Sequence, residues 1–268
     1  MTIRFLSVPM FFAMLLASPA VAGINDGLLA HYPFDGNADD TSGNGNHGTA
    51  YNDFSYVPGV ADQAIHLVGS GHTGLGGGHV LIPSLPLDTL DEFTIGLWAY
   101  YEGHTTTFGG ESFIQFGRGA FGDNSIYGIT YNPDDTGIGY HAGGPWTTGV
   151  SSVGTPWSAD FQDNWHHFAL RVENGTLTGF LDGLIVGTDT YSKPTTSTLE
   201  EVAGIGVHWF NSGGTESNRF IGSIDDVRIY DRALSDAEVL SLVPEPSGMC
   251  LAVIGCLICM GVCTRRCN

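Results

Sequence analysis

Short runs of apolar, β-branched and aromatic residues recur along the middle of the chain, each bounded by Gly, Asn, Asp or Pro. Several alternate apolar with polar positions, which is typical of strands that bury one face. Their spacing predicts an all-β fold in which two antiparallel sheets pack as a sandwich. The expected strands are 28–34, 64–68, 80–82, 93–101, 112–116, 126–131, 165–172, 176–181, 203–209 and 220–230.

Two turns and one helix can be placed within this pattern. Asn174-Gly175 and Asp182-Gly183 are dipeptides that accept the positive φ angles of two-residue hairpins, so the residues around them are expected to form a meander. Ser235, followed three residues later by Glu238, is a capping box ahead of apolar residues. It predicts a short helix that closes the domain.

The first 22 residues have the three parts of a secretory signal peptide. Arg4 supplies a basic start, residues 8–16 form an apolar run, and Ala20-Val21-Ala22 is a small-residue cleavage site. The apolar run is too short for a permanent membrane span. We therefore expect residues 1–22 to be removed on export.

The C-terminal 25 residues also differ from the rest of the chain. Pro244, Glu245 and Pro246 precede an uncharged run at 248–263, and Arg265 and Arg266 follow it. As a helix this run would be about 24 Å long, short of the ~30 Å hydrocarbon core but able to span it with bilayer thinning or snorkelling arginines. The arginines would keep that end in the cytoplasm.

This order of features resembles the PEP-CTERM sorting signal of Gram-negative bacteria. The resemblance implies a precursor held in the inner membrane by the helix at 248–263. An exosortase-type enzyme would process it and pass it to the cell surface or extracellular matrix. A plain tail anchor is the alternative interpretation. The expected division is therefore signal peptide 1–22, domain 23–243 and sorting segment 244–268.

Charge and cysteine content narrow the range of partners. Between residues 23 and 243 six basic residues stand against 27 acidic ones, a net charge of about −21. Such a surface repels nucleic acid and anionic lipid, so we expect neither as a partner of the domain. All five cysteines lie in the tail, so the domain has no disulfide although its compartment would allow one.

Five motifs in order along the domain resemble the laminin-G-like, concanavalin A-like jelly-roll family. They are GLLAHYPFDG at 27–36, DTSGNGNHG at 40–48, FTIGLW at 93–98, WHHFAL at 165–170 continuing to LDG at 181–183, and IDDVRIYDRALS at 224–235. The resemblance implies that the two sheets form a jelly roll, and that the opening loop lies near the closing strand. It says little about the ligand, because one fold hosts many functions.

The acidic opening loop is a candidate calcium site. Calcium takes six to eight oxygen ligands from carboxylates, amides and carbonyls, and a Gly-rich loop can supply them. The expected ligands are Asp39, Asp40, Asn44, Asn46 and Asp225. Asp225 alternates with Val227 and Ile229, so it is expected on the apolar face, where a carboxylate needs a partner. The alternative is a loop whose carboxylates only cap backbone amides.

Tryptophans in two kinds of context suggest two roles. Trp98, Trp165 and Trp209 lie in strand patterns and are expected in the core. Trp146 and Trp157 lie in Gly-, Pro- and Thr-rich loops, where they could stack on a sugar or a partner protein, or cover a sheet edge.

No catalytic set is found in the sequence. A glucanase strand of the Glu-x-Asp-x-x-Glu type is absent, as are a Gly-x-Ser-x-Gly motif and a phosphate-binding Gly-Lys loop. The sequence therefore predicts an exported, non-catalytic module that binds glycan or extracellular protein, with or without calcium. A structural matrix protein without a specific ligand is the main alternative, and a glycoside hydrolase is the lesser one.

Overall fold

The computed structural model describes residues 23–69, 77–103, 111–117, 126–132, 137–143, 151–156, 158–194, 203–209, 216–217 and 220–243. The signal peptide predicted at 1–22 and the sorting segment predicted at 244–268 lie outside these ranges. Among the residues that are described, no helix is both long and apolar enough to cross a bilayer.

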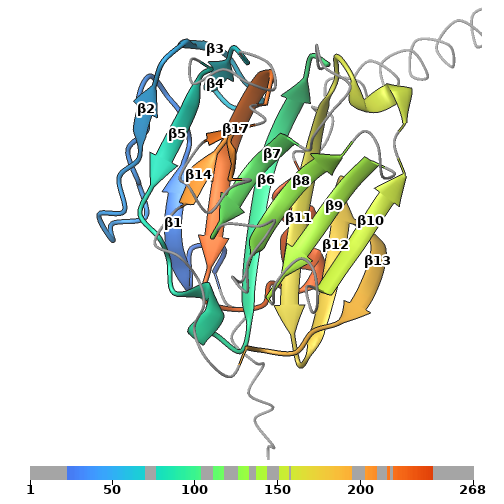
Figure 1. The fold of residues 1–268 in the computed structure, drawn as a ribbon. Helices are drawn as coiled ribbons and strands as arrows, with labels where there is room; N and C mark the ends of the chain where they lie inside the picture. Colours follow the sequence, from blue (N-terminus) through green and yellow to red (C-terminus); the bar gives the residue numbers. More distant parts are fainter. Residues whose placement is uncertain are drawn as a thin grey trace, which may run out of the picture.

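The chain folds into two antiparallel sheets, as predicted (Figure 1). The larger sheet has the order β13 (Leu184–Thr190), β12 (Thr176–Leu181), β11 (Trp165–Glu173), β6 (Phe93–Tyr101), β17 (Gly222–Tyr230), β4 (Gln63–Leu67) and β3 (Phe54–Pro58), with β1 (Leu28–Tyr32) also paired to β17. The smaller sheet has the order β10 (Ser151–Pro156), β9 (Gly137–Ala142), β8 (Tyr127–Asn132), β7 (Glu111–Phe116), β14 (Ala203–Ile205), β5 (His79–Ile82) and β2 (Thr49–Tyr51).

Short elements complete the described part of the chain. They are a two-stranded ribbon of β15 (His208–Trp209) and β16 (Glu216–Ser217), two 3-10 turns, η1 (Leu87–Thr89) and η2 (Ala159–Phe161), and the helix α1 (Asp236–Ser241). The expected hairpins are confirmed. Asn174 and Asp182 adopt φ angles of 49° and 50°, each followed by a glycine of positive φ, and they join β11 to β12 and β12 to β13.

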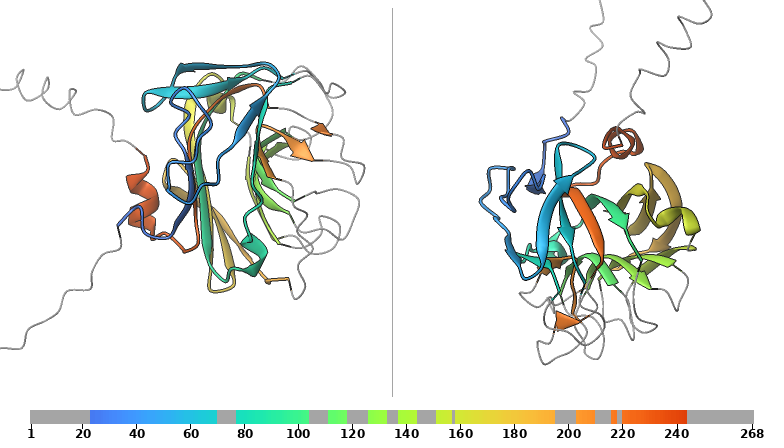
Figure 2. Two further views of the ribbon diagram at one scale, coloured as in Figure 1. Left: turned by 90° about the vertical axis from the view of Figure 1, so that its left-hand side faces the viewer. Right: turned by 90° about the horizontal axis from the view of Figure 1, so that it is seen from above.

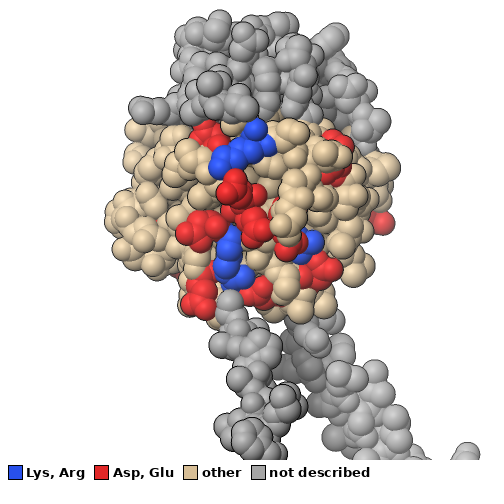
Figure 3. Space-filling model, turned by 90° about the horizontal axis from the view of Figure 1, so that it is seen from below, with Lys and Arg blue, Asp and Glu red and all other residues tan. Residues whose placement is uncertain are grey.

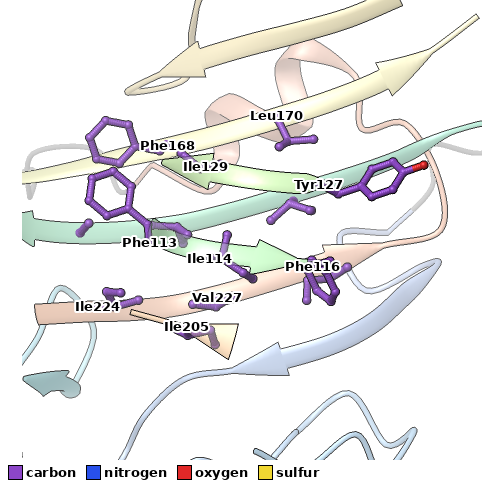
Figure 4. Close-up of a cluster of buried hydrophobic side chains, with 14 of the residues drawn as sticks. Phe113, Ile114, Phe116, Tyr127, Ile129, Phe168, Leu170, Ile205, Ile224 and Val227 are labelled. Atoms are coloured by element: carbon purple, nitrogen blue, oxygen red, sulfur yellow. The ribbon is translucent and has the colours of Figure 1, made fainter. Parts of the chain in front are cut away.

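The main core fills the space between the sheets (Figure 4). In β6 every second side chain points inward, and Phe93, Ile95 and Leu97 have no exposed surface. The rings of Phe113 in β7 and Phe168 in β11 meet across the layer at 5.0 Å between centroids. Each such side chain stabilises the fold by about 1.5–3 kcal/mol relative to leaving it in water. The strand pattern thus produces the sandwich through burial of alternate residues.

A second, smaller core lies on the outer face of the larger sheet, under α1 (Figure 2). Ala169 and Phe180 from the sheet pack there against Leu234, Val239 and Leu242. The capping box predicted for this helix is present. The Ser235 hydroxyl accepts the N–H of Glu238, and the Glu238 carboxylate accepts the N–H of Ser235. Helix α1 therefore covers part of this face and leaves the rest open.

Arg232 ties the two ends of the described domain together. Its guanidinium donates to the carbonyl oxygens of Asp26 at 2.6 Å and Gly23 at 3.1 Å, and to the Glu238 carboxylate at 2.8 Å. The hydrogen bond from Arg232 holds the pKa of Glu238 at about 2. Residues 23 and 243 consequently leave the domain on the face that carries α1 (Figure 2).

A bulge in β17 corrects the expected placement of Asp225. Ile224 lies opposite Ala99 and Asp225 opposite Trp98, but the register then shifts before Arg228, and Asp226 has a φ of 46°. The extra residue moves Asp225 to the outer face, whereas Ile224, Val227 and Ile229 all point into the core. Strict alternation across 225–229 was therefore a wrong assumption.

Glu111, at the start of β7, is a buried carboxyl inside the fold. It is 6% exposed, and its Oε2 atom has no hydrogen-bond partner. Burial raises its pKa to about 8, against the effect of the N–H group of Ile221 that hydrogen-bonds the carboxyl. The folded state therefore favours protonated Glu111 at pH values where the unfolded chain has ionised it.

We predict that Glu111→Gln stabilises the protein relative to the wild type as the pH rises from about 5 to about 8. A carboxyl with a raised pKa contributes stability that is lost across this window, by up to about 1.4 kcal/mol per pH unit, and glutamine removes that loss. Urea unfolding of both proteins at several pH values measures the difference. Glu92→Gln is the matched control. Parallel pH profiles for Glu111→Gln and the wild type would contradict the assignment.

Candidate functional site

The opening loop is organised by Asp40. Its Oδ1 atom accepts the backbone N–H groups of His31 at 2.9 Å and Ser42 at 2.8 Å, and its Oδ2 atom accepts that of Asn46 at 2.9 Å. Burial alone would raise the pKa of Asp40, but these donors hold it below its ordinary value. Asp40 therefore acts as the internal cap of the loop.

The other expected ligands of this loop also have local roles. The side-chain amide of Asn44 donates to the carbonyl oxygens of Leu28 and Leu29, and that of Asn46 donates to Leu29. Asp39 has a side chain that is 61% exposed and lies 3.4 Å from His47. The asparagine bonds fasten the loop to β1.

Asp225 and Asp226 stand where the neighbour of β17 changes. Residues 222–224 of β17 pair with β4, and residues 227–230 pair with β1. The Asp225 Oδ2 atom accepts the N–H groups of Val60 and Ala61 in the β3–β4 turn, at 2.8 and 3.1 Å. Its Oδ1 atom is buried without a partner, and burial raises its pKa to about 6.

Asp226 contacts β1, the strand that pairs with the second half of β17. It lies 2.6 Å from the His31 ring of β1 and is bonded to Arg228 at 3.0 Å. These partners hold the pKa of Asp226 below its ordinary value, although burial opposes them. The opening segment does lie beside the closing strand, as the family resemblance implied, but the side-chain contact runs through Asp226 rather than Asp225.

The five expected calcium ligands do not form one ligand set in this conformation. Asp40 and Asp225 each accept hydrogen bonds from different backbone segments. Among the residues described, no cluster of three or more His, Cys, Asp or Glu side chains could hold a metal ion. The geometry does not fit a single ion shared by the loop and Asp225, and a calcium titration tests the site expected from the sequence directly.

The two loop tryptophans expected to bind ligand, Trp146 and Trp157, lie outside the described residues. Of the strand tryptophans, Trp98 is buried, but on the outer face of the larger sheet. Trp165 is only half-buried on that same face. The expectation that Trp165 belongs to the core is wrong. In β11 the core side chains are Phe168 and every second residue after it, and Trp165 lies an odd number of residues from them, on the opposite face of the strand.

A groove of about 510 Å³ crosses this outer face, within the size range of ligand sites. The rings of Tyr100 and Trp165 lie side by side at 5.7 Å between centroids and are tilted by 54°. Next to them the His66 ring lies 3.1 Å from the Glu102 carboxylate. The lining residues are Ser55, Val57, Pro58, His66, Tyr100, Glu102, Trp165 and Ser223.

Next to the groove, the row formed by Asp225, Trp98 and His167 on adjacent strands is buried. The indole N–H of Trp98 donates to the carbonyl oxygen of Leu242 at the end of α1. His167, beside Trp98 at 5.4 Å between ring centroids, is 1% exposed, and burial lowers its pKa to about 4. Helix α1 and the β3–β4 turn therefore cover the row of Asp225, Trp98 and His167 and leave the groove open beside it.

The described lysine and arginine side chains are paired with carboxylates, and the face seen in Figure 3 shows basic and acidic side chains next to one another. Each described lysine or arginine lies within 3.0 Å of a carboxylate, in the pairs Arg171–Asp236, Lys193–Asp91, Arg228–Asp226 and Arg232–Glu238. None of these four cations lines the groove. Its described charged groups are Glu102 and, when protonated, His66.

Comparisons with known proteins agree with this architecture. Residues 74–240 match the family model described as the concanavalin A-like lectin/glucanases superfamily. A comparison with curated proteins gives no match.

Solved structures with the same fold include a domain of an arabinanase and the binding domain of a neurotoxin. Domain 4 of AbnA, a GH43 extracellular arabinanase from Geobacillus stearothermophilus in complex with arabinotriose, superposes with a TM-score of 0.61 at 22% identity. The superposition covers 81% of this chain and 98% of the AbnA domain. The binding domain of botulinum neurotoxin DC, solved with SialylT and with rat synaptotagmin II, gives TM-scores of 0.63 and 0.64 at 13% identity. Those matches cover 82% of this chain and about half (52%) of the toxin domain.

We predict that adding millimolar calcium to the EDTA-treated protein leaves its melting temperature unchanged, because the carboxylates of Asp40 and Asp225 already serve backbone amides. Asp225→Ala should lower the free energy of unfolding by about 1–3 kcal/mol with or without calcium, since it leaves buried N–H groups unpaired. Differential scanning calorimetry measures both. A calcium-dependent rise that disappears in Asp225→Ala would instead establish the metal site expected from the sequence.

Proposed function

Because the chain belongs to the concanavalin A-like lectin/glucanases superfamily, we propose that its jelly-roll domain is a non-catalytic module that binds glycan in the groove of the larger sheet. The observation that carries this proposal is the half-exposed pair of Tyr100 and Trp165 beside the polar pair of His66 and Glu102. Aromatic faces pack against the C–H groups of a sugar ring, and polar groups bond its hydroxyls.

The polar part of the groove suits hydroxyl-rich ligands. The Glu102 carboxylate accepts hydrogen bonds, the Ser223 hydroxyl can donate or accept one, and the His66 ring can do either according to its tautomer. Two of the solved neighbours are named with a sugar ligand, arabinotriose and SialylT, and one with a protein, synaptotagmin II. They support glycan as the first partner to test and extracellular protein as the second.

The proposal that the module is not an enzyme rests on the carboxylates of the groove. Glycoside hydrolysis generally needs two carboxyl groups that flank the scissile bond, about 5–9.5 Å apart. Glu102 is the one carboxylate among the described residues that line the groove. A second catalytic carboxylate is therefore lacking in the described part of the site.

We predict that Tyr100→Ala and Trp165→Ala each weaken glycan binding by about fivefold or more, because stacking on an aromatic ring is typically worth about 1–3 kcal/mol in the comparable case of a nucleobase. A glycan array probed with the purified protein identifies the ligand, and isothermal titration measures the variants. Tyr51→Ala is the matched control, since Tyr51 is 43% exposed but lies on β2 of the other sheet.

Two results would count against the proposal. Binding that is unchanged in both groove variants would move the site elsewhere in the domain. No binding to any glycan or matrix extract would favour a structural matrix protein without a specific ligand.

We further propose that the protein is exported and sorted by its ends. The layout of residues 1–22 supports cleavage after Ala22, and the order Pro244-Glu245-Pro246, apolar run, Arg265-Arg266 supports an inner-membrane precursor handled by an exosortase-type enzyme. The product would then reach the cell surface or extracellular matrix.

Mass spectrometry of the protein from fractionated cells tests this route. We predict a mature N-terminus at Gly23 and a surface form that lacks residues after the Pro-Glu-Pro motif. Replacing Pro244 and Pro246 with alanine should hold the protein in the inner-membrane fraction. Equal surface delivery of the substituted protein would favour the plain tail anchor.

A further inference from the structure

The groove is a continuous row of side chains that runs across five strands. Ser55 on β3 lies opposite His66 on β4, His66 opposite Ser223 on β17, Ser223 opposite Tyr100 on β6, and Tyr100 opposite Trp165 on β11. Residues directly opposite each other share one face of a sheet. The row is therefore a feature of the register of the larger sheet and belongs to no single loop.

The length of this row sets the size of the ligand. Neighbouring strands lie about 4.8 Å apart, so five strands span about 19 Å, roughly four sugar units of an extended chain. At one end the row reaches β3, the last strand of the sheet, so a longer chain can continue past Ser55. At the other end Trp165 and Tyr100 form the aromatic pair.

The walls of the groove define its direction. The adjacent row is covered by Leu242 of the α1 end and by the β3–β4 turn, whose N–H groups bond Asp225. A ligand can therefore extend across the strands, from β11 to β3, but is blocked on the side of the closed row. This shape suits an internal stretch of a linear polymer better than a compact monosaccharide.

The charges select for a neutral chain. Every described lysine and arginine is paired with a carboxylate away from the groove lining, while the Glu102 carboxylate lies in it. A uronate or sialate group would meet Glu102 and the field of a domain with about 21 excess negative charges. Uncharged hydroxyls avoid this repulsion and can bond His66 and Glu102.

We propose that the row from Ser55 to Trp165 binds about four consecutive units of an extended, uncharged polysaccharide laid across the strands. The inference rests on the proposed glycan binding and deepens it by stating the ligand class and the direction in which the chain lies. Tyr100 and Trp165 hold the first units. His66, two strands further along, and Ser55, at the edge of the sheet, contact the later ones.

Titration calorimetry with the full chain in detergent tests the length. Neutral xylan, glucan and arabinan oligomers of one to six units are the probes, with oligogalacturonates of equal length as acidic counterparts. We predict that affinity for one neutral series rises at least tenfold from the disaccharide to the tetrasaccharide and changes little beyond it. The oligogalacturonates should bind at least tenfold more weakly than neutral oligomers of the same length.

A variant in the distal half of the row tests the direction. His66→Ala should weaken tetrasaccharide binding several-fold and leave disaccharide binding unchanged, because a disaccharide held by Tyr100 and Trp165 ends before β4. Trp165→Ala should weaken binding of both lengths. Tyr51→Ala, on the other sheet, is the control that should change neither.

The outcomes separate this inference from the proposed function. Equal affinity for a disaccharide and a hexasaccharide, equal binding of the acidic oligomers, or an equal effect of His66→Ala at every length would overturn the extended neutral site while glycan binding itself stands. No binding of any oligomer, or binding that Trp165→Ala does not affect, would overturn the groove as a glycan site altogether.

Discussion

The larger sheet depends on one feature of β17: along the same side, this strand pairs with two different strands. Its first half pairs with β4 and its second half with β1, so the two partners diverge at Asp225 and Asp226. Asp225 accepts the amides of the β3–β4 turn, and Asp226 binds His31 of β1. The bulge at this point allows two adjacent aspartates to bind different partners, one in the β3–β4 turn and one in β1. Gly59 is required nearby, since a Cβ atom there would overlap the Asp225 carboxylate and lie only 2.9 Å from the backbone nitrogen of Ala64.

The same arrangement determines which part of the outer face is accessible. Because the β3–β4 turn folds over Asp225 and the end of α1 bonds Trp98, the row beneath them is buried together with a neutral His167. The next row lies beyond both covers and remains open as the groove. The ion pairs have a similar effect on charge, since cations committed to neighbouring carboxylates are not available to an acidic ligand. Structural contacts thus define the chemistry of the site.

Much of the fold could be predicted from local patterns. Phe93–Tyr101 and Thr176–Leu181 have the bounds that their apolar runs indicate, and the Asn-Gly and Asp-Gly turns follow from the positive φ those residues accept. The strand β9 was missed because glycine interrupts its apolar pattern, and β10 because small polar residues do. Such strands are specified by their neighbours in the sheet more than by their own composition.

The candidate site could be predicted far less well. The bulge at Asp226 reverses the face of Asp225, and no composition signal distinguishes a bulged strand from a regular one. The acidic loop has the residue types of a calcium site and of an Asx-rich turn alike, and only the positions of the N–H groups around Asp40 separate them. Tyr100, Trp165 and His66 come together through the register of several strands, which a single sequence does not encode locally.

The fastening of the chain ends on one face has a mechanical consequence. A load applied to a polymer in the groove and resisted at residue 243 does not pull the two sheets apart, because both points of attachment belong to the larger sheet and its outer cover. The load passes through the contact between α1 and that sheet. This contact consists of a small apolar cluster, the bond from Trp98 to Leu242 and the ion pair between Arg171 of β11 and Asp236 of α1. Under tension the helix would peel away first, lengthening the connection while the sandwich and its groove stay intact.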